Sequence, residues 1–235
     1  MQTTIDLKSA QWRRTWMARP WHMKAISEPN GTVEVNGVRG FLTFQDVAFL
    51  FNAAGDLPRG GTYVEIGSWL GLSAIAVATG LLANVNVRAR IFAVDTWCGS
   101  MEHKHIAEIR DGTAFDICTR NLDSAGVLDF VTLVRGDSAQ AASAWRDGPI
   151  DMLFVDGDHS FDGCILDLRS WYPHLATGAV VLGHDAAPST GVVDAVHTFC
   201  RETGLRAAVL EPPHAHYIWQ ILRGGQEVKP GWRML

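Results

Sequence analysis

The sequence predicts an α/β domain in which a mainly parallel sheet carries helices on both faces. Two short apolar runs, residues 152–155 and 179–182, are rich in valine and leucine, which is typical of strands buried in a parallel sheet. Between them, residues 161–173 carry apolar side chains at near-helical spacing and are long enough for a crossover helix. Because such βαβ units are right-handed, both strands are expected to end at the same edge of the sheet.

The composition is that of an ordinary globular protein of 235 residues, which is enough for one large α/β domain. A formal net charge of -5 argues against a general nucleic-acid-binding protein, which usually needs a basic face. No apolar run is long enough for a membrane helix, and residues 1–24 lack the apolar centre of a secretory signal. Four widely spaced cysteines without a CxxC pair predict a reduced, cytoplasmic protein without a disulfide framework.

Three segments are predicted: a helical accessory segment (residues 1–61), the main domain (residues 62–223) and a C-terminal tail (residues 224–235). Trp12 and Trp16 fall on one helical face, which indicates an amphipathic helix that packs on the body or on a second subunit, or a lid over the site. Asn36-Gly37 predicts a hairpin over residues 34–38. Thr43 is suited to be the N-cap of a helix over residues 46–54.

The main domain begins after a turn-rich break and continues as alternating strands and helices. Its last two strands are joined by a connection too short for a crossover, which predicts an antiparallel pair at the end of a seven-stranded sheet. The predicted strands are residues 62–66, 90–94, 130–134, 152–155, 179–182, 205–210 and 217–222, and the predicted helices are residues 74–82, 113–124, 139–145, 161–173 and 192–201.

A glycine turn, with Gly67 and Gly71, follows the first of these strands. Glycine here lets the backbone approach a ligand closely, and the helix N-terminus that follows favours polar or anionic groups. Asp95 ends the second strand at about the spacing of an acid that binds ribose hydroxyls, roughly 20 residues beyond the turn. The turn lacks the full GxGxxG pattern, so a tight turn without a ligand is the alternative, and for Asp95 the alternative is a helix cap.

Asp137 and Ser138 follow the third strand. Either residue is suited to cap the helix over residues 139–145, which is the stronger interpretation on local grounds. An acid at this position is also suited to accept a hydrogen bond from the exocyclic amine of a base.

Two histidine pairs are similar to metal ligands only in their spacing. His103 and His105 alternate with a lysine in a polar loop and are expected to be solvated. His214 and His216 lie between the last two strands, and we expect no metal there.

Carboxylates and histidines follow the strands over residues 152–155 and 179–182. Since both strands end at the edge where open α/β sheets bind ligands, these side chains are expected to converge. Helix capping by Asp158 or Ser160, and a turn at Asp185, are the alternatives. The residues expected to converge are Asp156, Asp158, His159, His184 and Asp185.

Residues 63–71 read Tyr-Val-Glu-Ile-Gly-Ser-Trp-Leu-Gly, and residues 95–99 read Asp-Thr-Trp-Cys-Gly. These motifs resemble the first motif and the ribose-binding acid of class I S-adenosylmethionine-dependent methyltransferases, whose Rossmann-like sheet has an antiparallel last strand. The resemblance is strongest over residues 63–185 and implies S-adenosylmethionine as the cofactor. The residues it implies in cofactor binding are Glu65, Gly67, Ser68, Gly71, Ser73, Asp95, Thr96, Trp97, Asp137, Ser138 and Asp156.

Within this family, Asp156-Gly157-Asp158 and His184-Asp185 are similar to the metal-dependent O-methyltransferases of macrolide and aminocoumarin sugars. The resemblance implies a divalent cation, usually magnesium, on Asp156 and Asp185, with His184 as a third ligand. An imidazole departs from the usual oxygen donor and suits zinc, iron or nickel better than magnesium. The alternatives for His184 are a contact with the substrate and simple packing. The resemblance offers two candidates for the catalytic base, Asp158 and His159, and does not choose between them.

The resemblance therefore predicts an O-methyltransferase, assisted by a divalent cation, that methylates a small polyhydroxylated or sugar-bearing metabolite in natural-product tailoring. A sugar-type hydroxyl is almost never ionised at neutral pH, so a cation and a base both assist its attack. We expect a hydroxylated small-molecule acceptor, a homo-oligomer, and no nucleic-acid or membrane partner. The alternatives are an NAD-dependent oxidoreductase and a cofactor-binding or scaffold protein without catalysis.

Overall fold

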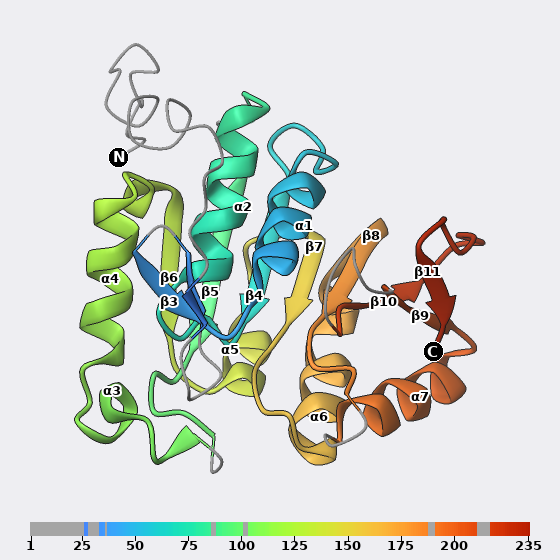
Figure 1. Cartoon of the computed structure of the whole chain (residues 1–235). Helices are drawn as coiled ribbons and strands as arrows, with labels where there is room; N and C mark the ends of the chain where they lie inside the picture. The colour runs from blue at the N-terminus through green and yellow to red at the C-terminus, as the bar shows by residue number, and fades with distance from the viewer. Residues whose placement is uncertain are drawn as a thin grey trace.

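The computed structural model describes residues 26–27, 33–35, 37–85, 88–100, 103–187, 191–210 and 217–235. At its centre lies an eight-stranded sheet with the order β11-β9-β10-β8-β7-β4-β5-β6 (Figure 1). Neighbouring strands from β8 to β6 run parallel, which confirms the predicted, mainly parallel Rossmann-like sheet. These parallel strands are β4 (Thr62–Ile66), β5 (Arg90–Asp95), β6 (Val131–Arg135), β7 (Ile150–Val155) and β8 (Leu175–Gly183).

The C-terminal edge of the sheet is antiparallel. Strand β10 (Trp219–Leu222) lies between β8 and β9 (Arg206–Leu210) and runs antiparallel to both, as predicted for the terminal strand. Strand β11 (Trp232–Met234) pairs with β9 and is an eighth strand, where the sequence predicted seven. It lies within residues 224–235, and a run of three residues is too short for an alternating pattern to be recognised.

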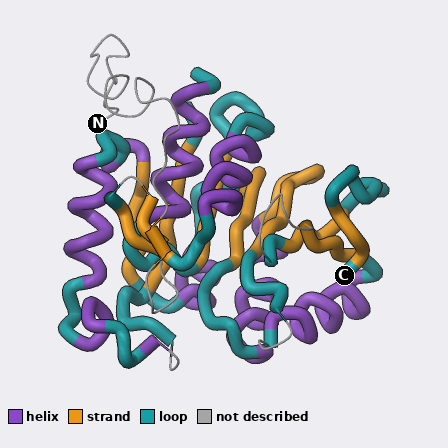
Figure 2. The backbone as a smooth tube through the Cα atoms, in the orientation of Figure 1, coloured by secondary structure: helices purple, strands orange, loops and turns teal. Residues whose placement is uncertain are grey.

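Helices cover both faces of the sheet (Figure 2). Successive strand side chains point to opposite faces, so Tyr63 packs in one core and Val64 in the other. The short helix α3 (Ala107–Arg110) was not predicted. The core of Tyr63 includes residues of α1 (Phe44–Ala54), α2 (Leu72–Ala83) and α4 (Ala114–Ser124), and the core of Val64 includes residues of α5 (Ser138–Ala144), α6 (Phe161–Trp171) and α7 (Val192–Thr203).

A small antiparallel sheet precedes the main one. It consists of β1 (Ile26–Ser27), β2 (Val33–Val35) and β3 (Val38–Gly40), so the predicted hairpin is confirmed and β1 is an addition to it. The predicted helix with Trp12 and Trp16 lies outside the described residues, as do His214 and His216. Among the helices that the structure describes, none has the length and apolar character needed to cross a membrane.

Helix α1 begins two residues earlier than predicted, directly after its N-cap Thr43. The Thr43 hydroxyl accepts a hydrogen bond from the backbone N–H of Asp46, and the Asp46 carboxylate accepts one from the backbone N–H of Thr43 at 2.8 Å. This reciprocal capping box satisfies two N–H groups that the first helical turn leaves without partners, and it confirms Thr43 as the cap.

Candidate active site

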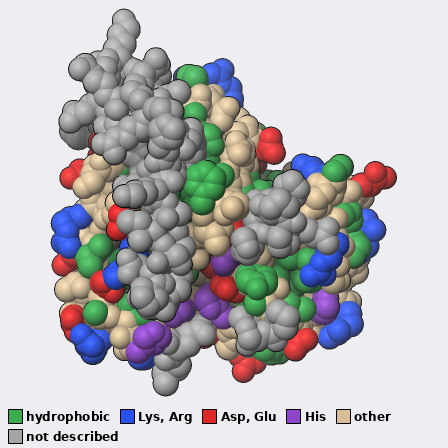
Figure 3. All heavy atoms as spheres, viewed as in Figure 1, with side chains coloured by type: hydrophobic (Ala, Val, Ile, Leu, Met, Phe, Trp, Pro, Cys, Tyr) green, Lys and Arg blue, Asp and Glu red, His purple; other side chains and the backbone are tan. Residues whose placement is uncertain are grey.

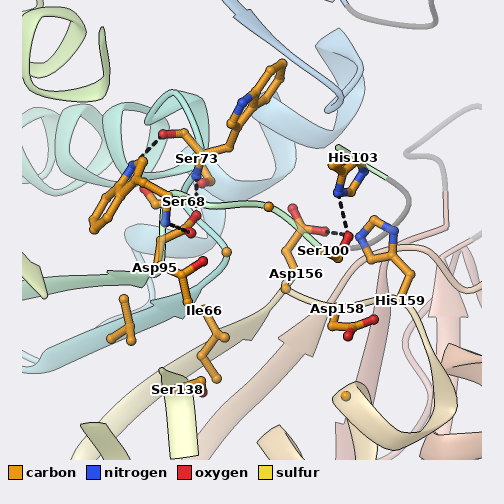
Figure 4. A pocket seen from close by; sticks show the side chains of 18 of the residues that line it. Ile66, Ser68, Ser73, Asp95, Ser100, His103, Ser138, Asp156, Asp158 and His159 are labelled. Atoms are coloured by element: carbon orange, nitrogen blue, oxygen red, sulfur yellow. Dashed lines mark hydrogen bonds and ion pairs between the residues drawn. The ribbon is translucent and has the colours of Figure 1, made fainter. Parts of the chain in front are cut away.

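A cavity of about 340 Å³ lies at the carboxyl ends of the parallel strands. Strand β4 has β5 on one side and β7 on the other, so the direction of chain progression reverses here, which is where open α/β sheets bind ligands. In Figure 4, Ser68, Ser73 and Asp95 lie on one side of the cavity, and Asp156 and His159 lie on the other. Figure 3 shows histidine and acidic side chains next to one another near the centre of one face of the molecule.

Gly67 forms the floor of the cavity at the end of β4. Its φ of +87° lies in the left-handed region, and a Cβ atom there would overlap the carbonyl oxygen of Asp156. The Gly67 N–H donates to the Val94 carbonyl at 2.9 Å, and the Asp156 N–H donates to the Ile66 carbonyl at 2.9 Å. Backbone hydrogen bonds thus hold together the ends of β4, β5 and β7 around a residue that must be glycine.

Glu65 lies behind this floor and is fully buried. Its Oε2 accepts a hydrogen bond from the Tyr63 hydroxyl at 3.0 Å. Burial raises the pKa of Glu65 to about 7, and the hydrogen bond from the Tyr63 hydroxyl offsets part of that rise. Among the described residues, neither Oε1 of Glu65 nor the hydroxyl of Ser68 has a hydrogen-bond partner. Buried polar atoms without partners are rare, and Ser68 and Ser73 line the cavity, so this wall is suited to a polar ligand.

Asp95 holds the two turns that frame the cavity. Its Oδ2 accepts from the backbone N–H of Trp69 at 2.7 Å, and its Oδ1 accepts from that of Trp97 at 2.6 Å. Both tryptophans have positive φ angles, 42° and 53°, which are unfavourable for large side chains. Burial raises the pKa of Asp95, while these backbone donors lower it. Each carboxylate oxygen can accept a second hydrogen bond, so Asp95 can hold both turns and also face a ligand.

Some of the residues implied in cofactor binding contribute to the packing of the walls. Trp97 is 2% exposed, packs edge-on against Phe115 at 4.8 Å, and donates its indole N–H to the Trp69 carbonyl. Gly71 begins α2 in the left-handed region, where a Cβ atom would lie 3.1 Å from Cys118 Sγ. Glu65 and Gly71 are not among the residues that line the cavity, whereas Thr96 and Trp97 are.

Asp137 and Ser138 lie on the cavity wall at the start of α5. Asp137 is the N-cap and accepts from the Gln140 N–H at 2.9 Å, which confirms the capping interpretation. The Ser138 hydroxyl accepts from the Trp171 indole N–H at 2.8 Å. Asp167 of α6 also lines this wall, and burial raises its pKa to about 7 while the Ser138 hydroxyl lowers it. Nothing in the local sequence indicates that a carboxyl in the middle of α6 reaches this wall.

The predicted convergence of acidic and histidine side chains is confirmed for Asp156, His159, His184 and Asp185. One potential ligand atom from each of Asp156, His184 and Asp185 lies within 4.8 Å of the others. His184 Nδ1 is 3.2 Å from Asp185 Oδ2 and 3.7 Å from Asp156 Oδ1. His159 Nε2 lies 3.0 Å from Asp185 Oδ2, so a second imidazole borders the same group.

Charge and burial shift the pKa values of the residues in this cluster in different directions. Burial raises the pKa of Asp156 to about 7, although the nearby imidazoles of His184 and His159 lower it. Burial also acts to raise the pKa of Asp185, but hydrogen bonds with His159 and His184 bring it below its usual range. Burial acts to lower the pKa of His184, and its carboxylate partners outweigh burial and raise it. The cluster therefore favours an ionised Asp185 beside a positive charge.

Asp158 differs from its neighbours because it is exposed and faces the start of α6. Its Oδ1 accepts from the Ser160 N–H at 2.9 Å, and Ser160 in turn accepts from the Gly163 N–H at 3.0 Å as the helix N-cap. Helix capping, the alternative weighed for this position, thus describes much of what Asp158 and Ser160 do.

The expectation that His103 is solvated is wrong. The ring stacks on Phe41 with a centroid distance of 5.7 Å and meets His159 edge-on at 5.5 Å. Its Nδ1 is hydrogen bonded to the Ser100 hydroxyl at 2.8 Å (Figure 4). A turn around Gly99, which packs against Ile109 of α3, folds this segment back onto the cavity, whereas His105 is exposed as predicted. A contact of this kind produces no repeating pattern in the sequence, so it could not be predicted.

An aromatic wall of Phe41 and Trp69, not predicted from sequence, closes one side of the cavity. The two rings stack at 4.8 Å, and the Arg39 guanidinium lies 5.8 Å from the Trp69 ring. Arg39 is held by an ion pair with Glu108 of α3. The Trp69 indole N–H is buried and has no hydrogen-bond partner among the described residues.

A family model described as "Methyltransferase domain" matches residues 64–186, about half of the sequence and the part that forms the cavity. The chain belongs to this family. Membership confirms the resemblance to class I S-adenosylmethionine-dependent methyltransferases, and the antiparallel insertion of β10 agrees with it.

Individual relatives of this methyltransferase domain are distant. The uncharacterized protein y4gI of Sinorhizobium fredii is 32% identical over 126 residues, which cover 52% of this chain but only 13% of that protein. Among solved structures, the O-methyltransferase NovP is 19% identical with a TM-score of 0.61, covering 77% of this chain and 81% of its own. Cofactor-bound Rv0187 from MTB is 18% identical with a TM-score of 0.54, covering 94% and 92%. At these identities the likeness establishes the fold.

The methyltransferase cavity fits the cofactor that the family implies. Polar atoms on Glu65 and Ser68 have no partner among the described residues, and Gly67 and Ser68, which line the cavity, follow Glu65 closely along the chain. Asp156, His184 and Asp185 offer two carboxylates and an imidazole, which is a donor set for a divalent ion.

Proposed function

We propose that this methyltransferase domain is an S-adenosylmethionine-dependent O-methyltransferase that acts on a hydroxyl of a small molecule with the help of a divalent cation. The observation that carries the proposal is that Asp156 and Asp185, which have His184 beside them, line the same cavity as the Gly67 turn. Methyl transfer to a weakly nucleophilic oxygen requires a site for the methyl donor and a site for an activating ion that adjoin each other in one cavity.

The cofactor is proposed to contact residues on three strand ends. Gly67, Ser68 and Ser73 would bind its amino-acid part, with the buried Glu65 behind them. Asp95 would accept hydrogen bonds from the ribose hydroxyls, while the Asp137–Ser138 turn faces the base. Gly71, Thr96 and Trp97 are proposed to support these contacts by shaping the turns.

When bound, S-adenosylmethionine supplies a methyl group on a positively charged sulfur, and the cation lowers the pKa of a coordinated hydroxyl. Asp156, His184 and Asp185 would hold the ion. His159 is proposed as the base because its ring borders the cluster and is oriented by Asp185 at 3.0 Å. Asp158 remains the second candidate, but its carboxylate is engaged at the start of α6.

The acceptor is proposed to be a polyhydroxylated or sugar-bearing metabolite. The solved structure of CalS11, a TDP-rhamnose 3'-O-methyltransferase of calicheamicin biosynthesis, is 18% identical with a TM-score of 0.52 and covers 77% of both chains. The stacked Phe41 and Trp69 rings next to the carboxylates offer an apolar face beside hydroxyl-binding groups, which suits a sugar ring. A role in natural-product tailoring, a cytoplasmic location, and the absence of a nucleic-acid partner stay predictions.

Calorimetric titration with S-adenosylmethionine and S-adenosylhomocysteine tests the cofactor assignment. Binding in the micromolar range supports it, and no binding at millimolar ligand contradicts it. A parallel fluorescence titration with NADH tests the oxidoreductase alternative, which requires binding of the nicotinamide cofactor.

The ion is tested separately. Transfer of a labelled methyl group to a panel of nucleotide sugars and other polyhydroxylated compounds should stop in excess chelator and return with added divalent ion. Asp156→Ala and Asp185→Ala should abolish transfer and leave S-adenosylhomocysteine affinity nearly unchanged. Transfer that persists in chelator would exclude the cation. Light scattering of the full chain and of a chain without residues 1–40 tests the proposed homo-oligomer.

A further inference from the structure

Asp46, the third residue of α1, is a fully buried carboxylate outside the catalytic groups discussed above. Carboxylates are almost never fully buried unless they are paired. Its Oδ2 accepts from the Thr43 N–H at 2.8 Å and from the Thr43 hydroxyl at 2.6 Å. Helix capping does not require such burial, since Asp137 caps α5 while exposed to solvent. The burial of Asp46 therefore reflects a further contact.

That contact is with His184 at the end of β8. Asp46 Oδ2 lies 3.5 Å from His184 Nε2, an atom that has no hydrogen-bond partner of ideal geometry among the described residues. The other ring nitrogen, Nδ1, is hydrogen bonded to Asp185 Oδ2 at 3.2 Å and lies 3.7 Å from Asp156 Oδ1, so an ion that binds here replaces a proton at Nδ1. The imidazole therefore lies between the carboxylate of α1 and the two carboxylates of the proposed ion site.

The backbone of His184 is fixed on both sides. Its N–H donates to the Val155 carbonyl of β7 at 3.1 Å, and its carbonyl accepts from the Trp219 indole N–H at 2.8 Å. With the backbone fixed, the partners of the two ring nitrogens decide which of them carries the proton. A proton held on Nε2 leaves the Nδ1 lone pair available to a metal ion.

We infer that Asp46 is a positioning residue that keeps a proton on His184 Nε2 and presents Nδ1 to the ion, so that the site selects a first-row transition ion over magnesium. The inference rests on the proposed function, because it requires that an ion binds at Asp156 and Asp185. Magnesium prefers oxygen ligands, whereas an imidazole nitrogen suits nickel, cobalt or zinc. A carboxylate behind a ligating histidine typically contributes 10–100-fold to metal affinity.

The test is calorimetric titration of the full chain with Co²⁺ and with Mg²⁺. The wild-type protein should bind Co²⁺ more tightly than Mg²⁺. Asp46→Asn keeps the shape and an acceptor for the Thr43 N–H but removes the charge facing His184, so its Co²⁺ affinity should fall about 10–100-fold while Mg²⁺ affinity changes much less. The visible absorption of bound Co²⁺, which reports nitrogen coordination, should change in the same variant.

Thr43→Ala is the matched control, because it removes the hydroxyl half of the capping box and leaves the Asp46 carboxylate facing His184. It should weaken α1 and keep the Co²⁺ preference. His184→Asn replaces the nitrogen donor by an oxygen donor and should reduce the preference for Co²⁺ over Mg²⁺. Co²⁺ affinity within twofold of wild type in a folded Asp46→Asn protein, as judged by circular dichroism, would overturn the inference.

A second readout separates this inference from the proposed function. In ion-free protein, nuclear magnetic resonance should show a His184 Nε2–H proton protected from exchange, and Asp46→Asn, whose neutral amide oxygen accepts more weakly than a carboxylate, should speed that exchange. Protection without any ion binding in the wild type would refute the proposed cation and, with it, the selection among ions, while the positioning contact stands. Tight ion binding with an exchange rate that Asp46→Asn leaves unchanged would refute the positioning role alone.

Discussion

Gly67 and Asp156 are in backbone contact across the ends of β4 and β7, so closely that a Cβ atom at Gly67 would also lie 2.8 Å from the Cα of Gly157. The contact joins the proposed cofactor turn to the first ligand of the proposed ion site. No side chain can enter there unless the two strand ends separate, and their separation would alter both sites together.

Gly67→Ala should therefore destabilise the fold and weaken S-adenosylhomocysteine binding. The matched control is Gly178→Ala, since Gly178 also has a positive φ, +81°, but nothing lies within 4 Å of its Cβ position. Both variants carry the cost of the left-handed conformation, and only Gly67→Ala adds overpacking, about 1–3 kcal/mol. Urea unfolding measures the difference in stability between the two variants. Equal losses of stability would show that the contact accommodates a methyl group without a free-energy cost.

Asp95→Asn should loosen both turns around the cavity. An amide has a single acceptor oxygen and cannot accept from the Trp69 and Trp97 N–H groups on both sides. One buried donor then lacks a partner, which costs about 1–3 kcal/mol of stability, and cofactor affinity should fall with it. Asp116→Asn, an exposed acid on α4, is the control and should change neither quantity. Unchanged S-adenosylhomocysteine affinity in Asp95→Asn would argue against the role of Asp95 at the ribose.

His159→Ala and Asp158→Asn distinguish the two candidate bases. Loss of the base should lower kcat about 10²–10⁴-fold with little change in cofactor affinity. We expect this for His159→Ala, because its ring borders Asp185, and we expect Asp158→Asn mainly to loosen the start of α6. Single-turnover methyl transfer measures both, and the opposite ranking would assign the base to Asp158.

Asp167 should make stability depend on pH. Burial raises its pKa from 3.8 to about 7, so the folded protein keeps a proton that the unfolded chain has lost. The free energy of unfolding should fall as pH rises between these two values and level off above about 7. Asp167→Asn lacks this dependence. Its free energy of unfolding, relative to that of the wild type, should therefore rise by about 2–3 kcal/mol between pH 5 and pH 7. Chemical denaturation of both proteins at pH 5 and pH 7 measures this change. An equal pH dependence of stability in the two proteins would refute a buried, protonated Asp167.

The positions of the parallel strands along the chain could be predicted because their signals are local and strong. The run Thr62–Ile66 is rich in aromatic and β-branched residues and bounded by glycines, and the structure gives β4 these same bounds. The convergence of Asp156 and Asp185 followed from the handedness of one βαβ unit. In both cases a general rule of sheet geometry converts sequence spacing into spatial position.

What sequence did not predict depends on contacts between distant segments. Asp46 has the spacing of a capping residue, and nothing near it indicates that its carboxylate meets His184, far along the chain. His103 lies in a polar loop whose path is set by the packing of Gly99 on Ile109. Such contacts are decided by tertiary packing, which neither periodicity nor local propensity encodes.

The position of β10 also determines when this edge of the sheet can form during synthesis. In the described sheet, β9 pairs only with β10 and β11, which both come later in the sequence. Until β10 has left the ribosome, β9 has no neighbour and the outer edge of β8 is open. Unpaired edges of this kind promote association between nascent chains. The sheet edge is therefore protected only once β10 and β11 have been synthesised.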